Sequence, residues 1–420
     1  MKIALVSAYD YPYPGGVTEH VRALDTHLRR RGHEVVIIAP SSAAAADLAP
    51  NVRPVRGVRV IRANGSTSRL GLALSTGAQV RRTLRREAPE IVHIHEPLAP
   101  LVPLLALRHS RAVNVGTFHA YGSAGAGYRL AGRLLGGFMR RLHGRIAVSG
   151  PARTYAQSYL PGDYTVIPNG VDVARFAAPG PVPAAMRDGR PAILFVGRFG
   201  EPRKGFAVLL AALPQVRAAC PDAHLVVVGH GEPREFADRL PADPAAVTFA
   251  GMVSPAELPA YFQAATVYCS PATGQESFGV VLLEAMAAGA PLVASDNPGY
   301  ASVVTPEHDG LLVPREDPQA LAAALIRLLT EPATRARLVA GGRATAAHYD
   351  WPLVAGRIET FYRQTLERTA ATRRGADAHP RPLSLPGRGE RGSLASWGEG
   401  WGEGQPQAGP GDHETRMTEQ

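Results

Sequence analysis

The chain begins with MKIALVSAYDYPYPGGVTEHVRALDTHLRRRGHEVVIIAP (residues 1–40), in which two apolar runs flank a helical pattern. Residues 2–8 and 34–40 are mostly apolar, as expected of strands buried on both faces of a parallel sheet. Between them, Gly32 marks the expected end of a helix whose apolar residues recur at helical spacing (Val17, Val21, Leu24, Leu28). This stretch therefore predicts a strand–helix–strand unit with parallel strands.

The same alternation continues along the chain and restarts after a stretch rich in Pro, Gly and Ala, residues 168–191, which we expect to be a linker. It predicts an α/β protein with two tandem Rossmann-like, doubly wound domains, over residues 1–170 and 171–350. A last amphipathic helix is expected at 351–369. Residues 370–420 are rich in Gly and Pro, lack periodicity and are expected to be disordered. The later apolar runs are IVHIHEP (91–97), VNVGTF (113–118), GRIAVSG (144–150), AILFVGRF (192–199), HLVVVGHG (224–231), VTFAGM (247–252), TVYCSP (266–271) and PLVASD (291–296).

Composition restricts the class of protein. The formal net charge is +9, and all 45 basic residues except Lys2 and Lys204 are Arg. Such a balance suits nucleic acid, an anionic membrane or a phosphorylated substrate, but 6% aromatic residues and no recognition motif argue against nucleic acid. Two cysteines give no disulfide framework. The chain opens on a strand and contains no apolar run long enough to cross a bilayer, so a cytoplasmic protein is expected.

Two junctions between a strand and a helix carry phosphate-binding features. Gly15-Gly16 follows the first strand, where backbone N–H groups and a helix N-terminus can approach a diphosphate, although an ordinary turn would also use these glycines. In FVGRFGEPRKG, Arg198 follows a strand and Lys204 lies at the expected start of a helix. A cation there opposes the helix dipole unless an anion lies between them. The alternative is a pair of solvated surface charges.

A third segment, GQESFGVVLLEAMAAGAPLVASD (274–296), places Glu276 in a loop and Glu284 on a helix that is apolar almost all round. A carboxylate on a buried helix is costly unless it is hydrogen-bonded, and sugar hydroxyls would supply donors. The backbone of Ser277, Phe278 and Gly279 offers N–H groups at the helix start. The alternative is a Glu paired with an Arg in the same domain.

Histidines follow two of the predicted strands. His119 ends one of them and is as compatible with a structural role as with a catalytic one, and at least one of His93 and His95 is expected to be buried. The chain has neither Asp-x-Asp nor zinc-ligand spacing, so no metal site and no tightly bound cofactor are expected. Mg²⁺ remains compatible with a diphosphate substrate.

Taken together, GGVTEHV, FVGRF with RKG, VVVGHGEP and ESFGVVLLEAMAAGAPLVAS resemble the family-4 retaining glycosyltransferases of the GT-B fold, over about residues 1–368. The resemblance implies two domains facing a cleft, with the last helix returning to the first domain. It implies that Gly16, Arg198 and Lys204 hold the diphosphate of a nucleotide-sugar, that Glu276 binds the hexose and Glu284 the ribose, and that His119 lies beside the sugar. The catalytic set is thus Arg198, Lys204, His119 and Glu276, and the sugar-donor set adds Gly15, Gly16, Ser277, Phe278, Gly279 and Glu284.

Within that family, PYPGGV, NGSTSRL, HIHEP, GTFHA, IPNGVD, EPRKG and YDW are most similar to the bacterial phosphatidylinositol mannosyltransferases, which use GDP-mannose. The resemblance implies an acceptor pocket formed by Tyr9, Thr18, Asn64, Ser66 and Arg69. Thr18 replaces a Gln of that family and Ala63 an aromatic residue, which leaves other acceptors open: a diacylglycerol, a soluble inositol phosphate or a polysaccharide, with a GDP- or UDP-sugar.

Two basic amphipathic segments favour a peripheral position on the cytoplasmic face of the plasma membrane. Arg81, Arg82, Arg85 and Arg86 cluster on a presumed helix beside Val80 and Leu84, and a similar pattern recurs at 128–145. Such helices suit an anionic leaflet, although each alone could be a solvated face. The expected partners are a nucleotide-sugar, an anionic phospholipid surface and a lipid acceptor, and the chain is expected to act as a monomer.

Overall fold

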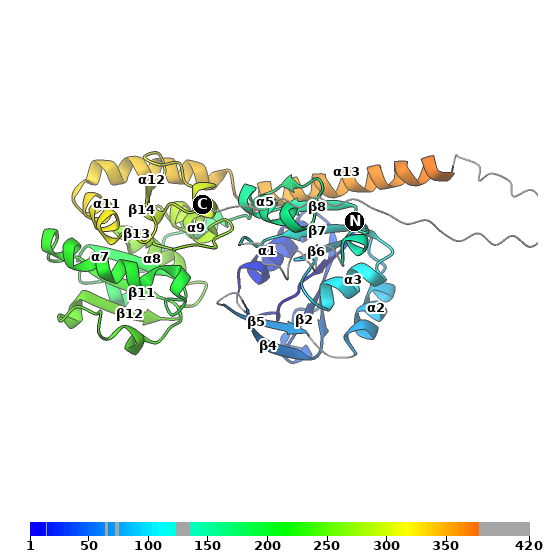
Figure 1. The fold of residues 1–420 in the computed structure, drawn as a ribbon, viewed down its shortest axis with the longest axis horizontal. Coiled ribbons are helices and arrows are strands. Elements are labelled where there is room, and N and C mark those ends of the chain that lie inside the picture. Colours follow the sequence, from blue (N-terminus) through cyan, green and yellow to red (C-terminus); the bar gives the residue numbers. More distant parts are fainter. Residues whose placement is uncertain (14, 64–65, 72–74, 123–134, 378–420) are drawn as a thin grey trace, which may run out of the picture. The chain divides into compact units, whose positions relative to one another are not determined.

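The computed structural model describes residues 1–13, 15–63, 66–71, 75–122 and 135–377. Residues Met1–Arg373 form one compact unit. This unit contains one parallel sheet of seven strands and another of six, each with helices packed against it (Figure 1). The predicted pair of doubly wound α/β domains is therefore confirmed.

The first sheet has the strand order β3-β2-β1-β6-β7-β8-β9, and its neighbouring strands are parallel. Its strands are β1 (Lys2–Val6), β2 (Glu34–Pro40), β3 (Val52–Val55), β6 (Ile91–His95), β7 (Val113–Phe118), β8 (Gly144–Ala147) and β9 (Thr165–Val166). The helices of this domain include α1 (Gly16–Arg30), α2 (Thr76–Glu87), α3 (Val102–His109), α5 (Gly150–Tyr159) and the short η1 (Ala45–Asp47). The sequence did not reveal the separate antiparallel hairpin of β4 (Val58–Ala63) and β5 (Ser66–Gly71).

The second sheet has the order β12-β11-β10-β13-β14-β15 and is also parallel. Its strands are β10 (Ala192–Val196), β11 (His224–Val228), β12 (Val247–Gly251), β13 (Val267–Ser270), β14 (Leu292–Ser295) and β15 (Leu311–Val313). The helices of this domain are α6 (Val173–Ala177), α7 (Phe206–Ala219), α8 (Leu258–Ala264), α9 (Val280–Ala288), α10 (Pro298–Ala301), α11 (Pro318–Thr330) and α12 (Pro332–Ala347), and α13 (Trp351–Asp377) follows them. Short turns of 3₁₀ helix are η2 (Ala184–Met186), η3 (Pro202–Lys204), η4 (Pro233–Phe236) and η5 (Pro244–Ala246).

The expected linker at 168–191 is partly a component of the second domain. It contains α6, and Phe176 and Met186 from this stretch are buried in the same core as Phe262 and Tyr268. The bulky apolar side chains within a Pro- and Gly-rich composition explain the difference, because burying them is worth about 1.5–3 kcal/mol each.

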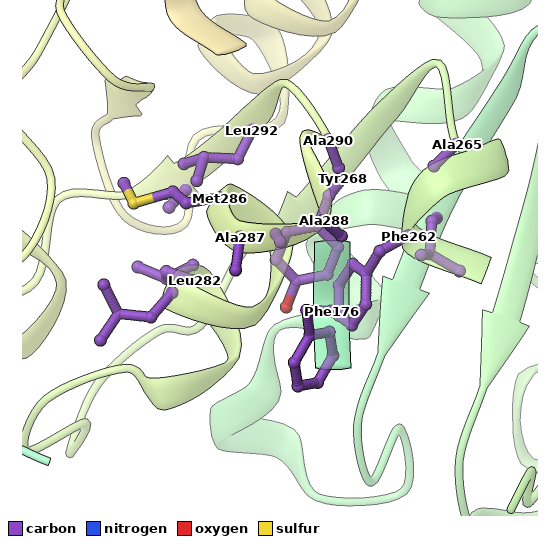
Figure 2. Close-up of a cluster of buried hydrophobic side chains, with 14 of the residues drawn as sticks. Phe176, Phe262, Ala265, Tyr268, Leu282, Met286, Ala287, Ala288, Ala290 and Leu292 are labelled. Carbon is purple, nitrogen blue, oxygen red and sulfur yellow. The ribbon is translucent and has the colours of Figure 1, made fainter. Parts of the chain in front are cut away.

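The helix α9 is buried on nearly all sides, as its sequence predicts. Leu282 and Met286 of α9 lie in one cluster with Phe176, Phe262 and Tyr268, from α6, α8 and β13 (Figure 2). A helix enclosed in this way has a fixed position, so the loop that enters it is fixed at one end as well.

The last helix, α13, packs against the first domain, as expected for the fold (Figure 1). Its Trp351 and Phe361 share a buried cluster with Leu5 of β1. Two glycines permit this approach, since a Cβ at Gly170 would lie 2.5 Å from the Trp351 ring and one at Gly144 would lie 2.7 Å from Phe361. α13 continues to Asp377, beyond its expected end at 369, and residues 378–420 lie outside the described part. Among the described residues, no helix is long and apolar enough to cross a membrane.

An ion-pair cluster also joins α13 to the first domain. Glu359, nearly buried, lies 2.5 Å from the Arg31 guanidinium and 2.7 Å from that of Arg363. The hydrogen bonds from Arg31 and Arg363 lower the pKa of Glu359 from 4.5 to about 2. The ionised carboxylate is thus more stable in the folded protein than in the unfolded chain.

We expect Glu359→Gln to lower the free energy of unfolding by about 1–3 kcal/mol near neutral pH. Because the folded-state pKa is depressed, this contribution is present above pH 4.5 and is lost as the pH falls toward 2. Urea unfolding of both proteins at neutral pH and at about pH 3 measures the difference, which should shrink in acid. Glu367→Gln, at an exposed position of the same helix, is the control. An equal loss at both pH values would contradict the electrostatic explanation.

Candidate active site

The predicted site residues follow the strands at which the strand order of each sheet reverses. In the first sheet, β1 pairs with both β2 and β6, and in the second, β10 pairs with both β11 and β13. The connections leaving two such neighbours diverge, which opens a crevice at the carboxyl ends of the strands, where α/β proteins bind ligands. Gly15-Gly16 follows β1 and His95 ends β6, while Arg198 follows β10 and Glu276 follows β13.

Gly15 and Gly16 border open space at the start of α1. Apart from its chain neighbours and its own helix, a Cβ at either position would meet no atom of the described residues within 4 Å, and Gly15 has an extended backbone (φ 177°) that any residue adopts. Neither the fold nor the backbone conformation therefore requires glycine here. This favours the phosphate-binding interpretation over the ordinary turn, because a ligand approaching the backbone would require the missing side chains.

Three of the predicted polar residues of the second domain lie on one chain of ion pairs. Arg198 lies 2.8 Å from Glu201, which lies 2.8 Å from Arg203. Arg203 and Lys204 then share one oxygen of Glu276, at 2.8 and 2.7 Å. The three cations and two carboxylates sum to one positive charge. The structure thus brings Arg198, Lys204 and Glu276 together, and it adds Glu201 and Arg203, which the sequence reasoning missed.

This arrangement bears on the alternatives weighed from the sequence. Lys204 is not a solvated surface charge, since its side chain is 21% exposed and ion-paired, whereas Arg198 is 48% exposed. Glu276 is paired with an Arg of its own domain, which was the competing interpretation of its role. The two interpretations are compatible, because a carboxylate held by two cations still has one oxygen outside these two bonds. Lys204 itself ends η3, ahead of α7, and does not lie within that helix.

Close packing fixes the loop that carries Glu276. A Cβ at Gly299 would lie 2.1 Å from the carbonyl oxygen of Glu276, and one at Gly279 would lie 2.7 Å from the Tyr300 ring. Gln275 has a positive φ of 58°, which is unfavourable for a residue with a side chain. The Ser149 hydroxyl of the first domain donates to the Ser277 carbonyl at 2.5 Å. Strain and tight packing together leave this loop little freedom.

Glu284 lies on α9, partly buried. Burial raises the pKa of Glu284 to about 7, and the Arg175 charge opposes the rise. Burial thus favours the protonated form of Glu284 more than in an exposed Glu. A protonated carboxyl can donate a hydrogen bond and an ionised one can only accept, so either form can bond a hydroxyl group.

Four buried histidines meet in the first domain. His95 Nδ1 lies 3.0 Å from His119 Nε2, and the His20 ring meets the His119 ring edge-on, with centroids 4.8 Å apart. His20 Nδ1 bonds Asn169 at 2.9 Å. His93 is bonded to Thr117 and to Tyr362 of α13 at 2.6 Å, so His93 is a core residue, as expected for at least one of the pair.

Burial keeps these imidazoles neutral. It lowers the pKa of His20 to about 4 and that of His93 to about 3, and it holds the pKa of His95 and His119 well below the ordinary value. His20, His95 and His119 offer nitrogens within 4.8 Å of one another, a set that suits a transition metal. Sequence spacing could not reveal this set, because the three residues come from α1, β6 and the loop after β7.

The predicted acceptor residues are only partly described. Tyr9 follows β1 and is partly buried, whereas Thr18 is on α1 and only 2% exposed, so only a ligand reaching into the domain could contact it. Asn64 lies outside the described residues. Ser66 and Arg69 belong to β5, but their side chains are not among those described.

The structure restricts the predicted membrane contact of α2 to its charged residues. Arg81, Arg82, Arg85 and Arg86 are all exposed on α2. Val80 and Leu84, however, belong to the core of the first domain and are not available for insertion into a bilayer. The amphipathic pattern of α2 therefore reflects packing within the protein, and the helix can offer a membrane its charge alone. Residues 128–134 of the similar pattern at 128–145 lie outside the described part. In the remainder, Arg140 and Arg141 are exposed and Phe138 packs against the core of the first domain.

Comparisons with known proteins agree with this geometry. A family model described as Glycosyltransferase Family 4 matches residues 14–175, and one described as Glycosyl transferases group 1 matches residues 190–331. The chain is 39% identical to a phosphatidyl-myo-inositol mannosyltransferase from Mycolicibacterium smegmatis, over 86% of this chain and 93% of the relative. The chain belongs to the family 4 glycosyltransferases.

Solved structures support the fold of this glycosyltransferase. Sucrose-phosphate synthase from Thermosynechococcus elongatus superposes with a TM-score of 0.70 at 24% identity, covering 88% of this chain and all of the other. The Anabaena protein HepE, solved in complex with UDP and glucose, gives 0.69 at 20% identity, covering 86% and 98%. The GT-B fold implied by the sequence is thus confirmed.

We expect Arg198→Ala and Lys204→Ala each to lower sugar transfer by about 10²-fold or more, because each removes a fixed positive charge from the proposed diphosphate site. Neither should unfold the protein, since Arg203 remains to pair with Glu201 and Glu276. Glu276→Ala should lower turnover more than nucleotide affinity. Steady-state kinetics, nucleotide titration and thermal unfolding measure these effects.

The matched control is Arg217→Ala, which breaks an ion pair with Asp243 elsewhere in the same domain. It should leave turnover within about twofold of the wild type, since exposed pairs contribute little. Near-normal rates for the three site variants would contradict the site assignment.

Proposed function

We propose that this glycosyltransferase transfers mannose from GDP-mannose to phosphatidylinositol, with retention of the anomeric configuration. The observation that carries the proposal is the 39% identity to a phosphatidyl-myo-inositol mannosyltransferase, which extends through both domains and covers 93% of that relative. The local geometry supports the nucleotide-sugar part, because a net-positive chain of ion pairs follows β10 and β13, at the switch point of the second sheet.

The main chemical task is to stabilise the charge that grows on the leaving diphosphate. Arg198 and Lys204 already lie at the two ends of one ion-pair chain, so their charges are placed before the reaction begins. Such preorganised charge is the largest single contribution in many enzymes, because no reorganisation is needed as the transition state forms. A diphosphate would compete with Glu276 for Lys204. The freed Glu276 carboxylate would then be able to accept hydrogen bonds from the hexose hydroxyls.

We propose a front-face mechanism for retention, in which the leaving phosphate helps to deprotonate the acceptor hydroxyl. Retaining hydrolases instead use two carboxyl groups about 5–5.5 Å apart, one of them as nucleophile. Here Arg203 and Lys204 both bond one oxygen of Glu276, and such charged donors draw electron density from a carboxylate and weaken it as a nucleophile. A trapped glycosyl adduct on the enzyme would contradict this mechanism.

A second candidate function keeps the same catalytic site but changes the acceptor. Thr18 and Ala63 depart from the pattern of the phosphatidylinositol mannosyltransferases, and Thr18 is buried on α1. A diacylglycerol, a soluble inositol phosphate or a polysaccharide would use the same sugar-donor residues, because only contacts in the first domain would differ.

We also propose that the four exposed arginines of α2 bind an anionic membrane surface by charge alone. Each basic residue near such a surface contributes about 1 kcal/mol. Since Val80 and Leu84 of the same helix face the protein core, binding should be strongly weakened by salt.

Product mass spectrometry after incubation with GDP-mannose and phosphatidylinositol vesicles tests the proposed reaction. We expect a mannosylated phosphatidylinositol, absent with the Lys204→Ala variant. Parallel reactions contain UDP-glucose as the sugar donor, or diacylglycerol and soluble inositol phosphate as acceptors. If product forms with only one of these alternative substrates, the enzyme has that specificity. If no combination of sugar donor and acceptor gives product, the proposed function is contradicted.

Vesicle co-sedimentation tests the membrane surface. Arg81→Gln with Arg82→Gln should weaken binding to anionic vesicles by roughly 30-fold, the effect of two charges at about 1 kcal/mol each. The control, Arg234→Gln with Arg239→Gln, removes two exposed charges from the second domain and should change binding little. Equal binding of the wild type to neutral and anionic vesicles would contradict the electrostatic proposal.

A further inference from the structure

Glu96 joins the two strand ends that border the histidine cluster. It follows β6 directly, and its Oε1 accepts hydrogen bonds from the backbone N–H groups of His119, at 2.6 Å, and Ala120, at 2.7 Å. These two residues follow β7. A single carboxylate oxygen therefore holds both amides of the segment that carries the His119 side chain.

The backbone at Glu96 is strained. Its φ is +55°, a left-handed conformation that is unfavourable for a residue with a side chain. Pro97 follows, and the residue before a proline favours extended backbone. The Glu96 N–H donates to Thr117 of β7 at 2.8 Å, so both its amide and its carboxylate contact the same neighbouring segment. Strain of this kind persists where surrounding contacts enforce it, and it is concentrated at functional sites.

The preceding residue acts on the ring of the same histidine. His95 Nδ1 lies 3.0 Å from His119 Nε2. The other ring nitrogen of His119, its Nδ1, is outside this pair. His95 and Glu96 thus contact one residue in two ways, one through its ring and one through its backbone. Burial also raises the pKa of Glu96 to about 7, although both backbone hydrogen bonds favour its charged form.

From this geometry we infer that Glu96 is a positioning residue, which orients His119 in the active site by holding the amides of His119 and Ala120. The inference rests on the proposed function in so far as His119 lies beside the transferred sugar. Glu96 has no expected contact with substrate and should act only through His119. A purely structural role would instead affect the whole site or the stability of the fold.

A double-mutant cycle with His119 separates these roles. We expect Glu96→Ala to lower turnover by about 10- to 100-fold in the wild type, in the range for a misplaced catalytic group. In a His119→Ala background it should change turnover by less than about twofold, because residues that act as a unit are not additive. Glu96→Gln retains an oxygen acceptor for both amides and should restore most of the turnover. If Glu96→Ala lowers turnover by the same factor in the His119→Ala background as in the wild type, the inference is overturned.

Asp309 provides a matched control. It is a buried carboxylate of the second domain that accepts from the Thr305 amide at 2.7 Å and from the Thr345 hydroxyl at 2.7 Å. Asp309→Ala should lower the thermal midpoint, and any effect on turnover should be equal with and without His119. If Glu96→Ala, like Asp309→Ala, changes turnover equally with and without His119, then Glu96 has a structural role and the inference is overturned.

A second measurement does not depend on activity. In protein labelled with ¹⁵N-His and ¹⁵N-Ala, NMR follows the amides of residues 119 and 120 and the His119 ring nitrogens. We expect Glu96→Ala to shift both amides and the ring signals, and Glu96→Gln to shift them less. Unchanged ring signals would overturn the inference even if the wild type transferred no sugar. If the wild type transfers sugar but the effects of the Glu96 and His119 variants are additive, the inference is refuted and the proposed function is retained.

Discussion

The active-site region depends on one constraint, that all strands of a parallel sheet end at the same edge. In each domain the central strand is paired on both sides, and the connections on its two sides leave in opposite directions. Loops that are far apart in the sequence therefore meet at this edge. His95 and His119 meet in the first domain, and one chain of ion pairs joins Arg198 to Glu276 in the second.

Charge in the second domain is arranged so that a binding site can be assembled without leaving ions unpaired. Arg198, Arg203 and Lys204 would repel one another if they were alone, and a carboxylate between each neighbouring pair removes that cost. Glu201 and Glu276 each contact two cations. In the proposed binding mode a diphosphate replaces one carboxylate as partner, which would keep the cations compensated throughout binding.

The polar cluster of the first domain differs from that of the second, because it consists of buried imidazole groups and not of ion pairs. Their neutrality follows from burial, and directed hydrogen bonds hold two of the four rings, His20 through Asn169 and His93 through Thr117 and Tyr362. The other two rings, His95 and His119, are bonded to each other, and Glu96 holds the His119 amide. Since Tyr362 belongs to α13, the packing of the last helix on this domain contributes directly to the order of the cluster.

The sequence by itself determined the two α/β domains, most of their strands, the family and the residues around Arg198 and Glu276. These follow from apolar periodicity and from short motifs, which are local in the chain. Tertiary structure alone decided that Glu201 and Arg203 link the predicted residues, that Val80 and Leu84 face the core, and that Glu96 holds the His119 segment. Each of these depends on contacts between residues distant in sequence or on which face of a helix is covered. A pattern of residue types along one chain does not contain that information, because strand order and helix packing are set by the whole fold.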